Sequence, residues 1–171
     1  DLGWLFSMSM TSQGRVTASG LVPRAYEELV RGRHRDILLD ANSVTLPSGR
    51  QVPRPPGVQD TISQFIELAY QFSTGHTALQ VGHPFNVWLA RPGGVDLWTY
   101  DVPEEVTLNL PTLGPVQAFH IKPRPLNDPR GNITVEMWFA PSLQYLPVRV
   151  RLNLGDGTTY MDLMVDKIEQ R

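Results

Sequence analysis

Hydrophobic and polar residues alternate with a period of two along most of the chain, which is typical of strands with one buried and one wet face. The clearest segments are residues 4–11, 133–139, 148–153 and 160–168. Shorter segments, separated by Gly, Pro and Asn turns, are residues 14–20, 24–30, 35–40, 43–47, 85–90, 95–102, 105–110 and 116–122. The pattern predicts a mostly β protein (α+β), with a curved antiparallel sheet or open half-barrel of about 8–11 strands.

One segment, residues 58–72, has a helical period instead. Asp60 is a suitable N-cap for it. The apolar residues that recur at helical spacing are Ile62, Phe65, Ile66, Ala69 and Phe72. Residues 52–57 before it are rich in proline, which a central strand does not tolerate. We therefore expect one amphipathic helix packed on the sheet.

The C-terminal third is predicted to be an antiparallel meander. Asp156 and Gly157 form a two-residue hairpin signal between the last two strands. In the strand before this turn, we expect one set of side chains to face the core, namely Val148, Val150 and Leu152. The polar set on this hairpin is expected to form cross-strand ion pairs, and comprises Arg149, Arg151, Asp162 and Asp166.

Composition narrows the function classes. With 171 residues, the chain is long enough for one domain, 1–171, with a continuous core. Fifteen basic against seventeen acidic residues give a net charge of −2, so nucleic acid is not an expected partner. The absence of Cys excludes disulfides, thiolate catalysis and Cys-ligated metals. No apolar run spans a bilayer, and the start at Asp1 suggests a processed or excised domain.

The motifs of common enzyme classes do not occur. The chain has no G-x-G-x-x-G or P-loop pattern and no nucleophile elbow, and its four histidines lack metal-binding spacing. We predict no metal and no cofactor. Asp101, Glu104 and Glu105 cluster in what we interpret as a wet turn between two strands, although acid–base chemistry is an alternative. Residues 126–132 are interpreted as a plain turn.

Large apolar side chains are the remaining candidates for a binding function. Tryptophans occur on separate predicted strands at Trp4, Trp88, Trp98 and Trp138, and the chain has five Met. The simpler interpretation is packing in the core and on sheet faces. The alternative is an apolar cavity between the curved sheet and the helix, and composition does not distinguish a filled interior from a hollow one.

Three segments of the chain resemble the domain of unknown function 3108 family of bacterial envelope proteins. They read GRVTASGLVPRAYEE, PPGVQDTISQFIELAYQF and MWFAPSLQYLPVRVRL. The most specific block contains Trp138, Ala140, Pro141, Tyr145, Leu146, Pro147, Val148 and Arg149. The second contains Gly57, Gln59, Asp60, Ile62 and Ser63.

This resemblance implies a periplasmic domain of a Gram-negative bacterium, carried behind an N-terminal membrane segment and a Pro-rich linker. It also implies a fold similar to the periplasmic lipoprotein carriers, in which a half-barrel binds acyl chains on its concave face. The family has no agreed biochemical activity, so the resemblance supplies no catalytic residue.

We therefore expect a non-enzymatic envelope domain that binds a lipid, a lipoprotein acyl chain or a protein partner. The expected ligand-binding residues are Trp88, Trp98, Met137, Trp138, Tyr145 and Arg149. Arg149 is expected to orient a polar loop or a ligand headgroup. One alternative is a structural or interaction module that pairs through an exposed strand edge. The other is a cofactor-independent enzyme that uses carboxylates and His120.

Overall fold

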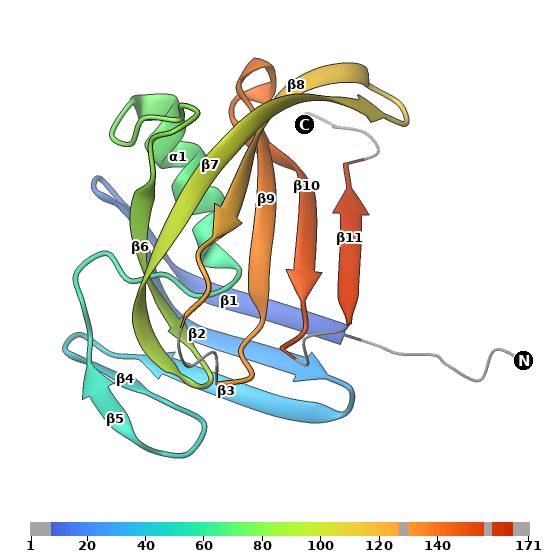
Figure 1. Ribbon diagram of the computed structural model, residues 1–171. Coiled ribbons are helices and arrows are strands. Elements are labelled where there is room, and N and C mark those ends of the chain that lie inside the picture. Colours follow the sequence, from blue (N-terminus) through green and yellow to red (C-terminus); the bar gives the residue numbers. More distant parts are fainter. Residues whose placement is uncertain (1–7, 127–129, 156–158, 166–171) are drawn as a thin grey trace, which may run out of the picture. The chain divides into compact units, whose positions relative to one another are not determined.

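The computed structural model describes residues 8–126, 130–155 and 159–165, and these residues form eleven strands, one α-helix and one short 3-10 helix (Figure 1). The prediction of a mostly β fold with one helix is confirmed. The strands form two antiparallel sheets, with the order β1-β2-β3-β4-β5 in one and β11-β10-β9-β8-β7-β6 in the other. No described helix has the length and apolar character that crossing a bilayer requires.

The chain also divides into two compact units. The first contains residues 8–64 and 88–96, and the second contains the other described residues. The expectation of a single domain over 1–171 stays a prediction.

The five-stranded sheet comprises β1 (Met8–Thr17), β2 (Gly20–Val30), β3 (Arg33–Leu39), β4 (Ser43–Thr45) and β5 (Gln51–Pro53). Its alternation follows the sequence pattern, since Met10 is partly buried and its neighbours Ser9 and Thr11 are exposed. Pro53 ends β5, which is an edge strand, where the missing N–H costs no ladder bond. The core of this unit comprises Tyr26, Ile37, Leu39, Val44, Leu46, Val58 and Ala90.

A buried ion pair lies beside this core. The carboxylate of Glu28 accepts hydrogen bonds from the Tyr26 hydroxyl at 2.9 Å and from Arg35 Nε and Nη2 at 3.1 and 2.6 Å. Glu28 is 1% exposed, so these bonds replace water around its charge. Burial, followed by the negative charge of Glu28, raises the pKa of Tyr26 well above its ordinary value. Tyr26 therefore stays a hydrogen-bond donor.

The helix α1 (Ser63–Thr74) begins at the predicted cap. Asp60 Oδ1 accepts hydrogen bonds from the backbone N–H groups of Ile62 and Ser63, and Ser63 Oγ accepts one from the Asp60 N–H. The helix starts later than residue 58 because Gln59 forms a parallel bridge with Leu89. The Gln59 N–H and C=O are hydrogen-bonded to Trp88 and Ala90 and are not available to a helix.

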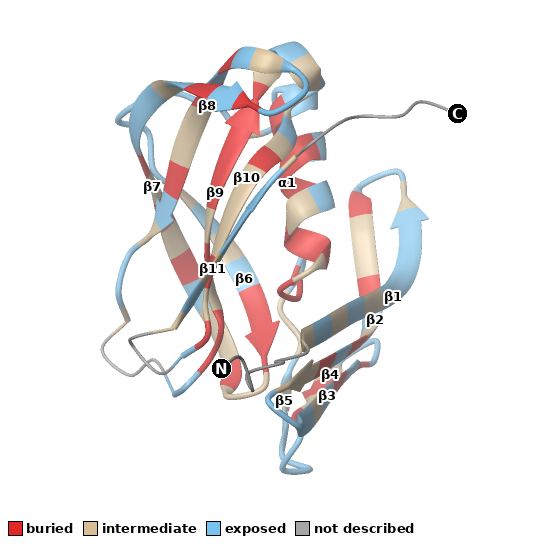
Figure 2. Cartoon of the chain, turned by 90° about the vertical axis from the view of Figure 1, so that its right-hand side faces the viewer, coloured by how far each residue is buried: buried red, intermediate tan, exposed pale blue. Residues whose placement is uncertain are grey.

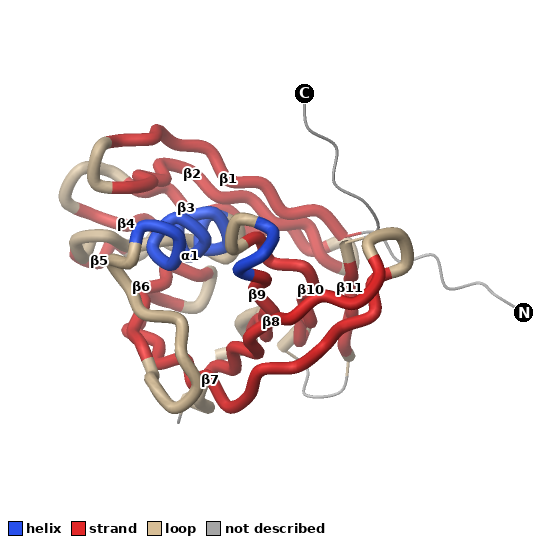
Figure 3. Tube along the Cα trace, turned by 90° about the horizontal axis from the view of Figure 1, so that it is seen from above, coloured by secondary structure: helices blue, strands red, loops and turns tan. Residues whose placement is uncertain are grey.

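The six-stranded sheet is a meander. It comprises β6 (Phe85–Arg91), β7 (Gly94–Leu110), β8 (Gly114–Pro123), β9 (Thr134–Ala140), β10 (Leu146–Asn153) and β11 (Tyr160–Met164). Aromatic rings join α1 to one face of this sheet, because Phe72 makes edge contacts with Phe85 and Phe139 at centroid distances of 5.4 and 5.1 Å. Figure 3 shows α1 in blue alongside the strands of this sheet, with the long strands β7 and β8 in red.

The interpretation of Asp101, Glu104 and Glu105 as a turn between two strands is wrong. They lie inside β7, a single strand of 17 residues, where the pairing with β8 shifts between Asp101 and Glu104. Such a bulge accommodates Pro103, which has no N–H for the ladder. Pro103 and its acidic neighbours therefore belong to a β-bulge within β7, and not to a turn between two strands.

The strand β9 is buried on both faces toward its C-terminal end, as Figure 2 shows by its run of red. Phe139 faces α1, and Trp138 lies in a second apolar cluster on the opposite face. The buried members of that cluster are Leu108, Leu110, Val116, Ala118, Trp138, Ala140 and Val148. A strand covered on both sides needs apolar residues at consecutive positions, and "MWFA" supplies them.

The structure also revises the prediction for β10. Val150 and Leu152 pair with Met137 and Val135 of β9, as expected for the helix-facing side. The pairing shifts between Pro147 and Arg149, so Val148 joins the cluster on the other face with Trp138. Predictions for Trp4, for the Asp156–Gly157 turn, for Asp166 and for residues 127–129 of the predicted turn 126–132 lie outside the described residues.

We predict that the Asp60 cap is a main stabilising element of the first unit. Asp60→Ala removes the acceptor for two backbone N–H groups and for the Ser12 hydroxyl, which donates to Oδ2 at 2.5 Å. The substitution should lower the free energy of unfolding by about 1–3 kcal/mol. Asp60→Asn keeps the capping oxygen and should cost less than about 1 kcal/mol. Urea unfolding followed by circular dichroism measures both, and equal losses for Ala and Asn would contradict the capping role.

Candidate functional site

The indole of Trp138 is held between side chains of the two neighbouring strands. The imidazole of His120 on β8 stacks on it at a centroid distance of 4.4 Å with an interplanar angle of 2°. The Arg149 guanidinium on β10 lies over the ring at 4.5 Å. The strand register explains this arrangement, because both His120 and Arg149 are direct cross-strand neighbours of Trp138.

His120 is also bound by two carboxylates. Its Nδ1 lies 3.1 Å from Glu104 Oε2 and its Nε2 lies 2.8 Å from Glu136 Oε1. The His120 side chain is 12% exposed, so its ring is largely shielded from solvent. An imidazolium donates to both carboxylates, whereas a neutral ring donates to only one of them. Both ring nitrogens are therefore engaged within the sheet.

Asp162 on β11 receives two arginines from β10. Arg149 donates to it through Nε and Nη2 at 2.8 and 2.7 Å, and Arg151 donates through the same two atoms at 3.2 and 3.0 Å. The hydrogen bond from Arg149 is the main cause that lowers the pKa of Asp162 to about 2, and Arg151 adds to it. The predicted cross-strand pairing of these three residues is confirmed.

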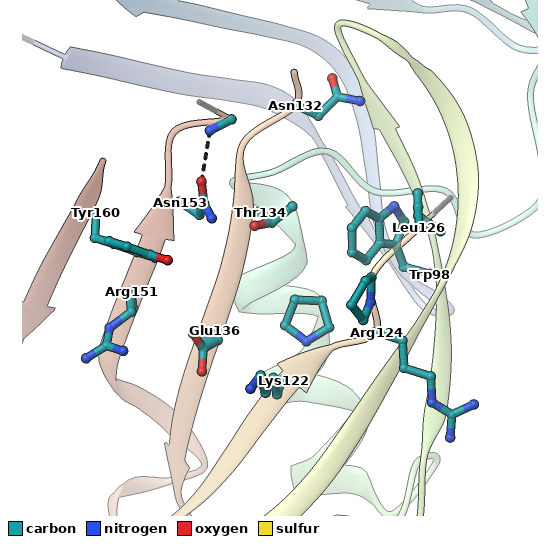
Figure 4. Close-up of a pocket in the computed structure, with 13 residues that line it drawn as sticks. Trp98, Lys122, Arg124, Leu126, Asn132, Thr134, Glu136, Arg151, Asn153 and Tyr160 are labelled. Atoms are coloured by element: carbon teal, nitrogen blue, oxygen red, sulfur yellow. Dashed lines mark hydrogen bonds between the residues drawn. The ribbon is translucent and has the colours of Figure 1, made fainter. Parts of the chain in front are cut away.

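A pocket of about 550 Å³ opens on this face of the six-stranded sheet, next to the bonded side chains. Glu136 lines it and is on the same side of β9 as Trp138, so the pocket lies on the face opposite the one that Phe139 turns to α1. Figure 4 shows Lys122, Glu136, Arg151 and Tyr160 projecting from neighbouring strands, with Trp98 and Leu126 beside them. Trp98 is buried at 3% exposure, whereas Tyr160 is 56% exposed.

The residues expected to bind a ligand are distributed over several places. Trp98 lines the pocket. Trp138 and Arg149 belong to the adjoining stack and do not line it, and Arg149 is bound to Asp162. Their roles in binding remain predictions.

The other three expected residues lie elsewhere. Met137 is fully buried on the helix-facing side of β9, because it pairs with Val150 and alternates with Trp138. Tyr145 is in the turn between β9 and β10, with a positive φ of 58°. Trp88 belongs to the first unit and is 37% exposed.

Sequence reasoning missed the polar residues of the pocket. Lys122 and Glu136 were expected only as strand residues with polar side chains, and Thr134, Asn153 and Tyr160 had no expected role. These residues come from four strands, so no local motif joins them. Their only signal was the period-two alternation, which puts each on the polar face of its strand.

A possible set of metal ligands occurs in the first unit, where the sequence showed none. One ligand atom from each of Glu27, His34 and Asp36 lies within 4.8 Å of the others, and His34 Nε2 is 3.1 Å from Asp36 Oδ1. Oxygen and imidazole ligands of this kind suit a divalent transition metal. All three residues are exposed on two paired strands, and the cross-strand pairing of Glu27 with Asp36 also explains the cluster. We assign no metal role to them.

Comparison with protein families gives one match. The family described as Protein of unknown function (DUF3108) matches residues 1–164. The chain belongs to this family. Neither the curated proteins nor the solved structures contain a significant match.

The most specific DUF3108 block of the chain corresponds to the connection between β9 and β10. Pro141 begins the short 3-10 helix η1 (Pro141–Leu143), and Gln144 and Tyr145 then take positive φ values of 59° and 58°. The Tyr145 N–H donates to the Ala140 carbonyl at 3.0 Å, which closes the turn. This connection and the bulge at Val148 place Arg149 opposite Trp138. The block therefore has a structural explanation.

The Asp162 pair predicts a specific loss of stability in acid. The folded pKa is depressed to about 2 from the ordinary 3.8, so the ionised pair contributes stability above about pH 4 and loses it as the pH falls towards 2. Because the Asp162 side chain is 36% exposed, we expect only about 0.5–1 kcal/mol.

Urea unfolding of the wild type and Asp162→Asn at pH 6, 4, 3 and 2 measures this contribution. The difference between the two proteins should shrink towards zero at pH 2. Glu105→Gln is the matched control, because Glu105 is exposed on β7. A difference for Asp162→Asn that is constant from pH 6 to 2 would contradict the assignment.

Proposed function

We propose that this DUF3108 chain is a non-enzymatic domain of the cell envelope that binds an apolar or amphipathic ligand. The observation that carries the proposal is the pocket of about 550 Å³, because it combines aromatic and apolar side chains with a few charged ones. Ligand pockets of proteins typically have volumes of about 300–1,000 Å³ and this mixed lining. The proposed binding site is therefore this pocket, and not the cavity between the sheet and the helix that the sequence analysis gave as an alternative.

The sides of the pocket differ in chemistry. Trp98, Leu126 and Tyr160 offer apolar surface, and Pro123 and Pro125 also line the pocket. Lys122, Arg151 and Glu136 are on the sheet strands. An elongated molecule with one polar end fits this division, since its apolar part contacts the rings and its polar end contacts the strands.

The stack around Trp138 supports the pocket without lining it. Arg149 and His120 fix the positions of Asp162 and Glu136, and these two carboxylates contact or line the pocket wall. A wall held by hydrogen bonds before binding loses less side-chain entropy when the ligand arrives. The sequence prediction that Arg149 orients a headgroup becomes, in this proposal, an indirect effect through Asp162 and Arg151.

Binding of dodecanoate tests the proposal. Native mass spectrometry of gently purified protein should show added mass that organic extraction removes, and calorimetry should show that the extracted protein binds dodecanoate. The double variant Leu126→Ser, Tyr160→Ser should bind about tenfold more weakly, because each side chain loses apolar contact area. Leu38→Ser on β3, which removes an exposed Leu of the first unit that does not line the pocket, is the matched control.

Two outcomes would count against this function. Extracted wild-type protein that ignores fatty acids, phospholipids and neutral detergents would exclude ligand binding of this kind. Equal loss in Leu38→Ser and in the pocket variant would show that the effect is not local. Thermal unfolding of each variant confirms that it is folded.

The envelope location is part of the proposal and is supported by the family resemblance. Osmotic shock of the native bacterium, followed by immunoblotting of the full-length protein, should find it with periplasmic or membrane markers. Recovery with cytoplasmic markers would contradict this part without affecting ligand binding.

A structural or interaction module is the second candidate function, and the edge strand β11 favours it. Tyr160, Leu163 and Met164 on this strand are 56%, 51% and 42% exposed. An open edge with apolar side chains can pair with a strand of another chain. Analytical ultracentrifugation of the wild type and of Leu163→Lys separates this function from ligand binding, since self-association that Leu163→Lys abolishes would support it.

The enzyme alternative has less support. His120 lies beside Glu136 at the pocket, but both of its ring nitrogens are engaged by carboxylates and its ring is stacked on Trp138. A general base needs a free lone pair directed at the substrate. The arrangement therefore favours a structural role for His120.

A further inference from the structure

The side chains that line the pocket carry unequal charge. Its cationic residues are Lys122, Arg124 and Arg151, and its anionic residue is Glu136. Carboxylates next to the pocket reduce this excess of positive charge. The ion pairs of each charged side chain therefore determine how much positive charge is available to a ligand. The pairing can be followed strand by strand.

The carboxylates of this region already have partners, and Glu104 shares His120 with Glu136. Asp101 accepts two hydrogen bonds from Arg124, at 2.9 and 2.8 Å, and these are the main cause of its lowered pKa. Glu136 is bound to His120. Asp162 is shared by Arg149 and Arg151. The Asp162 carboxylate thus accepts hydrogen bonds from two guanidinium groups.

Lys122 is the cation left over. It is exposed on β8, and among the described residues no ion pair involves it, although Asp101 is its cross-strand neighbour on β7. Asp101 is occupied because Arg124 uses both of its oxygens. Of the three cations that line the pocket, Arg124 and Arg151 are bound to Asp101 and Asp162, whereas Lys122 has no ion pair among the described residues.

The unpaired charge lies where a ligand can reach it. Lys122 lines the pocket together with Arg151, from strands on either side of β9, and Figure 4 shows both with Glu136 between them. Among the described residues, Arg151 donates to a single carboxylate oxygen, Asp162 Oδ2, at 3.0 and 3.2 Å, whereas Arg149 donates to both oxygens of Asp162 over shorter distances. Arg151 is therefore the weaker-held of the two arginines.

We propose that the pocket recognises the anionic group, a carboxylate or phosphate, of an amphipathic ligand through Lys122 and Arg151, while the apolar part contacts Trp98, Leu126 and Tyr160. This inference rests on the proposed ligand-binding function and deepens it by naming the ligand class. Lys122 supplies a positive charge that no ion pair among the described residues engages. Arg151 supplies directed N–H donors that match planar or tetrahedral oxyanions. Glu136 opposes the anion, which limits affinity and favours release.

The test compares matched amphiphiles on the same protein. Calorimetry below the micelle concentration measures the dissociation constants of dodecyl phosphate, dodecanoate, neutral dodecyl maltoside and inorganic phosphate. We expect both anionic amphiphiles to bind about three- to tenfold more tightly than dodecyl maltoside, because an exposed charge pair adds modestly to affinity. Inorganic phosphate should bind much more weakly than either of them.

Variants with opposite expected signs sharpen the test. Lys122→Gln should weaken the binding of both anionic amphiphiles about three- to tenfold and leave dodecyl maltoside unchanged. Glu136→Gln should strengthen the binding of the anions. Arg15→Gln, which removes one exposed positive charge in the first unit, is the control for net charge and should change nothing. Raising the salt concentration should reduce the difference between wild type and Lys122→Gln.

The outcomes separate this inference from the proposed function. If dodecyl maltoside binds as tightly as the anions and Lys122→Gln has no effect, the anionic headgroup is refuted and ligand binding stands. If inorganic phosphate binds as tightly as dodecyl phosphate, anion recognition stands and the amphipathic function is refuted. If nothing binds, both are overturned.

Discussion

The register of the central strands β8, β9 and β10 is the constraint on which the contact of Trp138 with His120 and Arg149 depends. These three side chains are direct neighbours across β8, β9 and β10, so the stack forms only if both pairings are correct. A slip of one residue would turn Trp138 towards α1 and bring Phe139 to the polar face. The bulge at Val148 and the two positive-φ residues before it make this register possible.

Hydrogen bonds extend from this stack to the pocket. His120 holds Glu136, and Arg149 holds Asp162, which in turn holds Arg151. Because a charged side chain on a partly buried face needs a partner of opposite charge, the position of Arg151 follows from that of Asp162. Arg124 binds Asp101, the cross-strand neighbour of Lys122. Lys122 is therefore left without a carboxylate partner among the described residues.

The first unit depends on a different constraint, the satisfaction of buried polar groups. Asp60 is fully buried, and burial raises its pKa, yet it accepts hydrogen bonds from two backbone N–H groups and from Ser12. Glu28 is likewise buried and bound by Tyr26 and Arg35. The second DUF3108 block, which contains Gln59 and Asp60, therefore has a structural role at the beginning of α1.

The sequence by itself determined the features that depend on local periodicity. Alternation predicted most strands and the polar face of β9, helical spacing predicted α1, and the position of Asp60 predicted its cap. It also predicted the pairing of Arg149 and Arg151 with Asp162, because those residues flank one hairpin. These features involve neighbours in the chain, whose spacing can be read directly.

Only the tertiary structure decided which strands share a sheet and what covers each face. Trp138 is on the polar side of β9 by periodicity, but the apolar cluster of β7, β8 and β10 buries it. Pro103 resembled a turn residue, but pairing of β7 with β8 on both sides of it makes it part of a bulge. The pocket is assembled from five strands, β7 to β11, and from loop residues that are distant in the chain. Contacts of this kind depend on long-range pairing and on the satisfaction of buried groups, which no local pattern of residues specifies.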